Sequence, residues 1–308
     1  MVDRASATIE APVSRPMAAV RSPARQVLRR ILGKPQAIVG GLLLAVVALA
    51  AILASVITTH DPYSQFVADP FSPPSLSHPF GTDQFGRDVF SRVVHGGRIS
   101  LRIGLVSVAI GGSLGLLLGA LSGYAGGWTD EVAMRLVDVM LAFPGVLMAL
   151  AIVIVLGPGL FNLMIAVGIG SIPTIARVVR ASVLEVKARD FVVAARALGG
   201  SDPRILVRHI LPNIMAPYMV LLTLNVALAI LSGTALSFLG IGVKPPSSEW
   251  GLMLSDARNF IRDAWWIGTF PGLAITITVI GINLLGDALR DALDPRLRGV
   301  RRWRQATT

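Results

Sequence analysis

Two short strings in the chain contain residues that could do chemistry. Residues 111–115, G-G-S-L-G, match the G-x-S-x-G pattern in which a serine, here Ser113, is the nucleophile of a hydrolase. Such a serine needs a strand before it, a helix after it, and a histidine and an acid within reach. Ser113 instead lies midway through a long apolar stretch, so we interpret it as a packing residue.

Asp83 and Asp88 belong to the second string, G-T-D followed by G-R-D, whose carboxylates could bind a metal ion. The four histidines are scattered without the spacing of metal ligands, and cysteine is absent. The sequence also lacks an H-E-x-x-H motif and the G-x-x-x-x-G-K-[ST] loop that holds a nucleotide phosphate. We therefore expect no catalytic residue, no metal site and no enzymatic activity.

The composition places the chain in a bilayer. Of its 308 residues, 53% are hydrophobic and 15% are charged, and the mean hydropathy is +0.68. A net charge of +10 would suggest nucleic acid as the partner of a soluble protein, but here the basic residues alternate with apolar stretches. We expect membrane lipid around the chain and no nucleic acid.

Six apolar stretches are long enough to cross the hydrocarbon core, which predicts an all-α membrane protein with six transmembrane helices. The first is a retained anchor, since it is longer than the core of a signal peptide. Pro144 lies inside the third stretch, and we expect Pro173 to bend the fourth. Loops are predicted at 58–98 and 237–258. The six stretches are residues 38–57, 100–124, 136–156, 163–179, 215–236 and 265–285.

Small and polar residues within these stretches suggest where helices meet. Gly111, Gly115, Gly119 and Gly123 recur every four residues, which predicts a flat stripe for close helix packing. Polar side chains are costly in hydrocarbon and face a cavity or another helix. Asn225 and Asn283 are therefore candidates either for lining a pathway or for an interhelical hydrogen bond.

Residues 190–213 form an amphipathic basic segment between two apolar stretches. Its first helix is predicted to end at Gly199 and Gly200, and Ser201 or Asp202 is expected to cap a second helix that ends near Pro212. This predicts a compact pair of helices suited to a protein partner. A basic loop lying on lipid headgroups is the alternative. The residues expected to form its contact surface and bend are Phe191, Ala194, Ala195, Leu198, Gly199, Gly200, Asp202, Arg204, Leu211 and Pro212.

The basic residues also predict an orientation. Of the 28 lysine and arginine residues, 21 fall on the side of residues 190–213 and 7 on the other. Because basic residues are retained in the cytoplasm, this side is predicted to be cytoplasmic, together with both termini.

Four blocks resemble one family. The A-A, three residues, Gly199 pattern, followed by Leu211 and Pro212, is similar to the EAA loop of ABC-type import permeases, with Val193 where the family has a glutamate. The string GTDxxGRDxxSRxxxGGRxSL, residues 237–258 and residues 283–298 resemble the dipeptide, oligopeptide and nickel branch. The resemblance covers most of residues 38–298.

The resemblance implies a type-1 ABC importer permease fold in a bacterial inner membrane. Expected partners are a homologous permease subunit, two ATP-binding subunits that hold ATP and Mg²⁺, and an external solute-binding protein. Peptides are the leading cargo, with nickel, glutathione or sugar as alternatives, while a channel or scaffold without ATPase coupling is the competing class. The expected parts are a basic tail (1–37), the first helix and external loop (38–97), the permease core (98–290) with its coupling loop (181–213), and a cytoplasmic tail (291–308).

Overall fold

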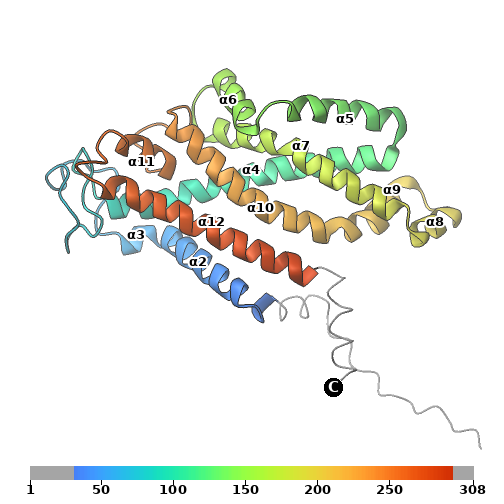
Figure 1. The fold of residues 1–308 in the computed structure, drawn as a ribbon, viewed down its shortest axis with the longest axis horizontal. Coiled ribbons are helices and arrows are strands. Elements are labelled where there is room, and N and C mark those ends of the chain that lie inside the picture. The colour runs from blue at the N-terminus through green and yellow to red at the C-terminus, as the bar shows by residue number, and fades with distance from the viewer. Residues whose placement is uncertain (1–30, 294–308) are drawn as a thin grey trace, which may run out of the picture.

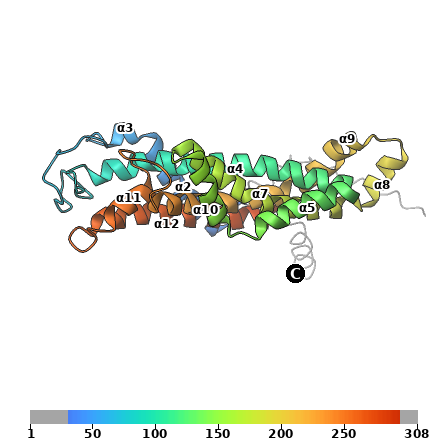
Figure 2. The ribbon, with the colours of Figure 1, turned by 90° about the horizontal axis from the view of Figure 1, so that it is seen from above.

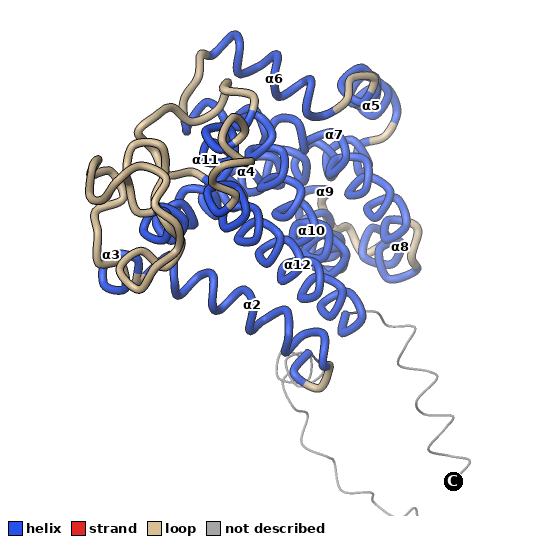
Figure 3. The backbone as a smooth tube through the Cα atoms, turned by 60° about the vertical axis from the view of Figure 1, so that its left-hand side comes forward, coloured by secondary structure: helices blue, strands red, loops and turns tan. Residues whose placement is uncertain are grey.

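The structure is a computed structural model that describes residues 31–293, a bundle of helices elongated along one axis (Figure 1). Within this range there is no β-strand, only an isolated bridge between Thr82 and Asp88, and most loop residues gather at one end (Figure 3). The helices are α2 (Pro35–Ile52), α3 (Ala54–Ile57), α4 (Val89–Ala125), α5 (Gly127–Leu141), α6 (Gly145–Leu156), α7 (Leu160–Lys187), α8 (Asp190–Ala197), α9 (Asp202–Ile205), η1 (Leu206–Ile210), α10 (Leu211–Phe238), α11 (Trp250–Ala257) and α12 (Trp266–Leu293).

In residues 31–293, five helices are long and apolar enough to cross a membrane: α2, α4, α7, the run Asp202–Phe238, and α12. The pair α5 and α6 makes a sixth if this bent pair counts as one span. The predicted all-α membrane protein is therefore confirmed. Most of the two predicted tails, residues 1–30 and 294–308, lies outside the described residues, and α2 begins at Pro35, inside the first predicted tail.

Helix α4 begins earlier than predicted. Residues up to Arg98 were expected to be loop, but the helix starts at Val89, where the Asp88 carboxylate accepts a hydrogen bond from the Ser91 amide at 2.7 Å. The first turns contain Arg92, which is 2% exposed and donates to the carbonyls of Pro62 and Ser247. An arginine that is buried against backbone oxygens lowers the mean hydropathy of a helix without ending the helix. The hydropathy of the sequence therefore placed the start of α4 too late.

The third predicted stretch, residues 136–156, is not one continuous helix. Helix α5 starts at Gly127 and ends at Leu141, and α6 then leaves at an angle of 90°. Pro144 is the N-cap of α6 with an extended ψ of 130°, and a residue before a proline avoids the helical region. The proline therefore separates two helices instead of lying inside one, while α7 continues through Pro173 without a break.

The bundle is centred on α4 and α7, which pack side by side along most of their length. Helix α10 packs on α4, α7 and α12, and α2 covers α12 from outside, where Lys34 pairs with Asp291. Two side-chain pairs tie α5 to α7: Asp130 with Arg180, at 2.5 Å, and Asp138 with Arg177.

The two ends of the bundle differ. Residues 58–88 and α11 lie at one end, which we call the loop end, and α8 and α9 lie at the other, which we call the helix-pair end (Figures 1 and 2). The start of α2 and the end of α12 both point away from the loop end (Figure 1). The 190–213 segment is thus separated from the 58–88 loop by the length of the bundle.

Candidate functional site

The candidate site begins with the helix pair, α8 and α9, which projects from its end of the bundle (Figure 2). The turn between the two helices depends on two glycines. The Gly199 amide donates to the Arg196 carbonyl at 3.0 Å and the Gly200 amide to the Ala195 carbonyl at 3.1 Å, which is the Schellman pattern that ends a helix. Gly199 has a φ of +82°, a conformation that glycine adopts without strain.

Apolar side chains fasten the helix pair to the bundle. Val192, Ile205 and Ile210 are at most 1% exposed and belong to one buried cluster with Val183 and Val186 of α7. Only one residue of α8, Val192, is fully buried. The helix pair is thus held by a small set of branched side chains.

Polar contacts add to this attachment. The Tyr124 hydroxyl, at the end of α4, donates to the Asp202 carboxylate at 2.5 Å. The Lys187 ammonium donates to the Tyr124 carbonyl at 2.6 Å and lies 5.3 Å from the Tyr124 ring centroid. Asp202 therefore anchors α9 to α4, whereas the N-cap residue Ser201 makes no side-chain capping bond.

The α8 residues expected to form a contact surface do not pack on the bundle. Phe191 and Leu198 are 41% and 88% exposed, Ala194 is exposed and Ala195 is half-buried. Helix α8 is turned so that Val192 enters the core, which leaves this face outside. Two large apolar side chains of this face are thus exposed, together with the neighbouring basic residues Arg196 and Arg204 of the same segment.

The second helix does not end near Pro212, contrary to the sequence expectation. The chain passes from α9 through the π-helical segment η1 into α10. Pro212 lies in the first turn of α10, directly after η1, whose last backbone bond runs from the Leu211 amide to the Leu206 carbonyl. Leu211 and Pro212 thus join the helix pair directly to a membrane-spanning helix.

The glycine stripe of α4 lies against α7. A Cβ built on Gly115 would lie 2.8 Å from the Ile175 Cβ, and one on Gly123 would lie 3.1 Å from the Arg180 carbonyl oxygen. Gly111 and Gly119 are still closer to backbone oxygens of α7. At Gly111, Gly115 and Gly119 the two helices therefore approach to a distance that excludes a methyl group, and at Gly123 a methyl group would be tightly packed.

Ser113 does not form a nucleophile elbow. It lies inside α4, and its hydroxyl donates to the carbonyls of Ala109 at 2.7 Å and Ile110 at 3.0 Å in the same helix. Serine commonly makes such bonds within helices. The geometry contradicts the strand–turn–helix that a hydrolase requires, and the side chain is exposed in the described chain, so its interpretation as a packing residue is not supported.

The two asparagines have different surroundings. Asn225 is 7% exposed, and its amide donates to the Leu221 carbonyl one turn earlier in α10. Asn283 lies on an exposed face of α12. Their role in lining a pathway stays a prediction.

A buried ionic cluster organises the loop end. The Arg87 Nε donates to the Asp83 carboxylate at 2.6 Å, the Arg92 Nε lies 3.5 Å from the same oxygen, and Asp256 lies 3.8 Å from Arg87. Asp83 thus pairs with arginines and does not form the metal or phosphate loop that its string could suggest. Burial raises the pKa of Asp256, and the charges of Arg92 and Arg87 oppose this rise.

The same end joins the two strings that resemble one branch of permeases. Trp250 Nε1 donates to the Val93 carbonyl at 2.8 Å, and Glu249 accepts bonds from the amides of Gly251 and Leu252 at 2.9 Å. Burial raises the pKa of Glu249, and these two amides oppose the rise. Residues 81–98 and 237–258 therefore form one packed unit.

Sequence reasoning missed several residues of these contacts. Val192 and Tyr124 were not singled out. Val192 is an apolar residue on a different side of α8 from Phe191 and Leu198, and this could have suggested that the helix has a second apolar side that is buried. His60 and His78 were described as scattered, but the structure brings both rings together beside Asp88. Nothing in their sequence spacing predicts this, because a folded loop separates them.

The chain is similar to known membrane transport proteins. Residues 115–299 match the family described as binding-protein-dependent transport system inner membrane component, and residues 22–74 match the N-terminal TM domain of oligopeptide transport permease C. A putative peptide transport system permease protein of Brucella suis is 48% identical over 90% of this chain and 94% of its own length. A dipeptide transport system permease protein DppC of Alkalihalophilus pseudofirmus is 43% identical over 90% and 91%.

Two further relatives extend the comparison. A glutathione transport system permease protein GsiD of Escherichia coli is 45% identical over 91% of this chain and 93% of its own length. Among solved structures, the MetNI methionine ABC transporter in inward-facing conformations matches with a TM-score of 0.56 and 19% identity. The match covers 66% of this chain and 96% of that chain, and it supports the fold alone.

Proposed function

Because the chain belongs to the family of binding-protein-dependent transport system inner membrane components, we propose that it is the permease subunit of an ATP-driven importer of dipeptides or oligopeptides. The observation that carries the cargo proposal is the near-complete coverage by relatives named for peptide or dipeptide transport. Glutathione, itself a tripeptide, is the second candidate, since a relative of similar identity is named for it.

The helix pair is the proposed contact with the ATP-binding subunits. Its outer face exposes Phe191, Val193 and Leu198, and its inner face is fixed to α7 by buried side chains. A coupling element has to be rigid and has to contact its partner differently in two states, since equal contacts shift no equilibrium. ATP and Mg²⁺ are proposed to bind on the partner subunits, because the sequence lacks a nucleotide-phosphate loop.

Movement of the helix pair is proposed to open the pathway alternately to each side of the membrane. The chain runs from α7 into α8 and from α9 into α10, so both spans are attached to the moving part. A homologous permease subunit is proposed to complete the pathway. The bend between α5 and α6 offers an apolar groove of about 450 Å³, with Phe143 and Met148 in its wall, for apolar helices of such a partner.

The orientation is proposed from charge. Arg189, Arg196, Arg204 and Arg208 lie on or beside the helix pair, and basic residues are retained in the cytoplasm. If the helix-pair end is cytoplasmic, the start of α2 and the end of α12 also face the cytoplasm. The loop end then faces an external solute-binding protein. The proposed location is a bacterial inner membrane.

Leu198→Glu tests the ATPase contact. The side chain is 88% exposed and makes no contribution to the core, so the variant should fold and insert normally. A charge on an apolar contact surface opposes association, and we expect the variant to lose copurification of the ATP-binding subunits and uptake of labelled dialanine. Leu76→Glu is the matched control for copurification of the ATP-binding subunits, because this leucine is fully exposed at the loop end, away from the helix pair.

The same measurements separate the proposed function from its alternatives. A channel or scaffold without ATPase coupling would bring down no ATP-binding subunit even with the natural sequence. Uptake of labelled glutathione in preference to dialanine would replace the proposed cargo while leaving the importer class intact. Equal copurification with Leu198→Glu and the natural chain would remove the helix pair as the ATPase contact.

A further inference from the structure

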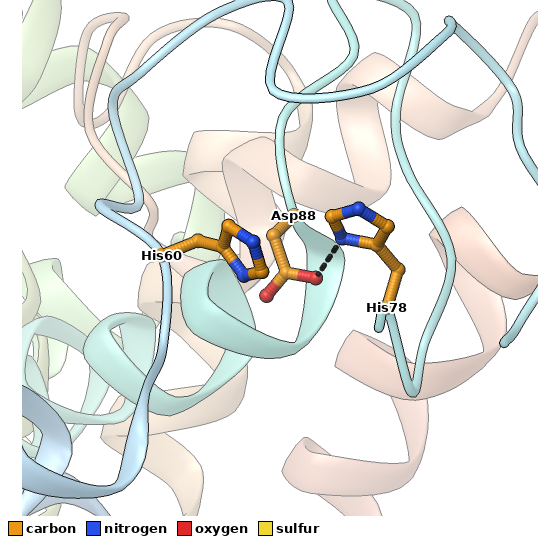
Figure 4. Close-up of side chains that lie close together, drawn as sticks. All are labelled: His60, His78 and Asp88. Atoms are coloured by element: carbon orange, nitrogen blue, oxygen red, sulfur yellow. Dashed lines mark hydrogen bonds and ion pairs between the residues drawn. The ribbon is translucent and has the colours of Figure 1, made fainter. Parts of the chain in front are cut away.

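Three side chains that can bind metal ions converge at the loop end (Figure 4). His60 follows α3, His78 lies in the long loop, and Asp88 is the N-cap of α4. The His78 Nδ1 lies 3.0 Å from the Asp88 Oδ1, and the imidazole centroids of His60 and His78 are 4.7 Å apart. One ligand atom from each residue lies within 4.8 Å of those of the other two.

A helix cap explains only part of this arrangement. Asp88 caps α4 through its Oδ2, which accepts the Ser91 amide at 2.7 Å, and this leaves its Oδ1 for His78. The cap has no need of His60, which nevertheless lies beside the Asp88 carboxylate (Figure 4). The His60 Nδ1 is 2.9 Å from the Thr59 hydroxyl, so the hydrogen bond that orients the ring leaves Nε2 for a ligand.

The distances suit a first-row transition metal. Two ligand atoms at about 2.0–2.1 Å from a tetrahedral ion lie about 3.3 Å from each other. The His78–Asp88 pair would open by about 0.3 Å from its present 3.0 Å, and the other separations, all within 4.8 Å, would close by at most about 1.5 Å. A small rotation of the half-buried His60 ring is the movement that this needs.

We propose that His60, His78 and Asp88 bind a Zn²⁺-class divalent ion that fastens the segment after α3 and the long loop to the first turn of α4. Two imidazoles and one carboxylate are ligands that zinc accepts, whereas calcium and magnesium prefer oxygen. To bind the metal through Nδ1, His78 carries its single proton on Nε2: a neutral ring moves its proton from Nδ1 to Nε2 through solvent, and an imidazolium releases its Nδ1 proton to solvent. Water completes the coordination. This site is separate from the proposed coupling at the other end of the bundle.

The metal would act by stabilising the loop end. The three ligands come from segments up to 28 positions apart in sequence, and an ion that binds only their folded arrangement shifts the equilibrium toward it. The loop end is the part proposed to meet an external partner, so its order would depend on the available metal. Zn²⁺ should therefore raise the temperature at which this end unfolds.

The test measures Zn²⁺ binding to the full-length chain in lipid nanodiscs after removal of metals with a chelator. Binding is followed by competition with a chromophoric chelator, and Co²⁺ is used as a second probe because its visible absorption reports nitrogen and oxygen ligands. We expect one Zn²⁺ per chain. His60→Ala should weaken binding by roughly tenfold or more, and Asp88→Asn should do the same while keeping a residue that caps the helix.

His95→Ala is the control. This histidine lies in α4, its Nδ1 is 3.0 Å from the Ser91 carbonyl, and it is half-buried like His60. The His95→Ala variant should bind Zn²⁺ as the natural chain does. Zn²⁺ should raise the thermal midpoint of the natural chain and of His95→Ala but not that of His60→Ala. Absence of Zn²⁺ binding by the natural chain, or equal binding by His60→Ala and His95→Ala, would overturn the proposal.

Discussion

Replacing Gly199 with valine tests whether the bend of the helix pair is needed for coupling. A Cβ on Gly199 would meet no atom within 4 Å, so the substitution creates no clash. The cost comes from the φ of +82°, which a β-branched residue adopts only with about 1–3 kcal/mol of strain. Since 1.4 kcal/mol corresponds to a factor of ten, the ratio of bent to unbent forms should fall roughly 5- to 150-fold.

The assay is substrate-stimulated ATPase activity of the importer reconstituted with its partner subunits, together with peptide uptake. Gly240→Val is the matched control, because Gly240 has a φ of +79°, also meets nothing within 4 Å, and lies at the other end of the bundle. Gly199→Asn should retain coupling, since asparagine tolerates the left-handed conformation. Full stimulation with Gly199→Val at normal membrane levels would refute the role of the bend. Equal loss with Gly240→Val would show that strain anywhere in the chain has the same effect.

Three other perturbations follow from the packing. Gly119→Ala gains about 1 kcal/mol of helix propensity, yet its Cβ would lie 2.9 Å from a side-chain carbon of α7 and nearer still to a backbone oxygen. We expect a lower thermal midpoint, at a net cost of about 1–3 kcal/mol, whereas Gly41→Ala, with nothing within 4 Å, should leave it unchanged or higher. Trp250→Phe should cost about 1–3 kcal/mol because the buried Val93 carbonyl loses its donor, and an unchanged midpoint would contradict this. Burial raises the pKa of Glu249, so its contribution to stability is complete at low pH and is lost as the pH rises from the ordinary glutamate value through the raised one. Glu249→Gln should flatten that part of a melting-temperature profile, and identical profiles would refute the assignment.

The sequence predicts five of the membrane spans because each is a long apolar run that must satisfy its backbone internally, whereas the third predicted stretch is divided at Pro144 into two helices. The four-residue spacing of Gly111 to Gly123 also predicts a close contact, since spacing along one helix fixes which residues share a face. The bend at Gly199 follows in the same way from a local requirement for a residue without a side chain. These are properties of neighbouring residues, and they need no knowledge of the rest of the fold.

Features that depend on distant residues were not predictable. The start of α4 at Val89 needs a buried Arg92, whose partners at Pro62 and Ser247 lie far away in sequence. The orientation of α8 depends on a pocket among α7 side chains that accepts Val192. In both cases local hydropathy predicts the opposite of the observed burial, because the charged Arg92 is buried and the apolar Phe191 and Leu198 are exposed.

The exposed face of the helix pair and the glycine contact belong to one mechanical arrangement. Only Ala188 and Arg189 separate α7 from α8, and η1 joins α9 to α10 without a loop. A rigid displacement of the helix pair therefore has to move α7 and α10 together. The close contact between α7 and α4 opposes sliding of one helix past the other, since three of the four glycine positions already exclude a methyl group. Within the proposed function, α4 and α7 should thus move as one unit.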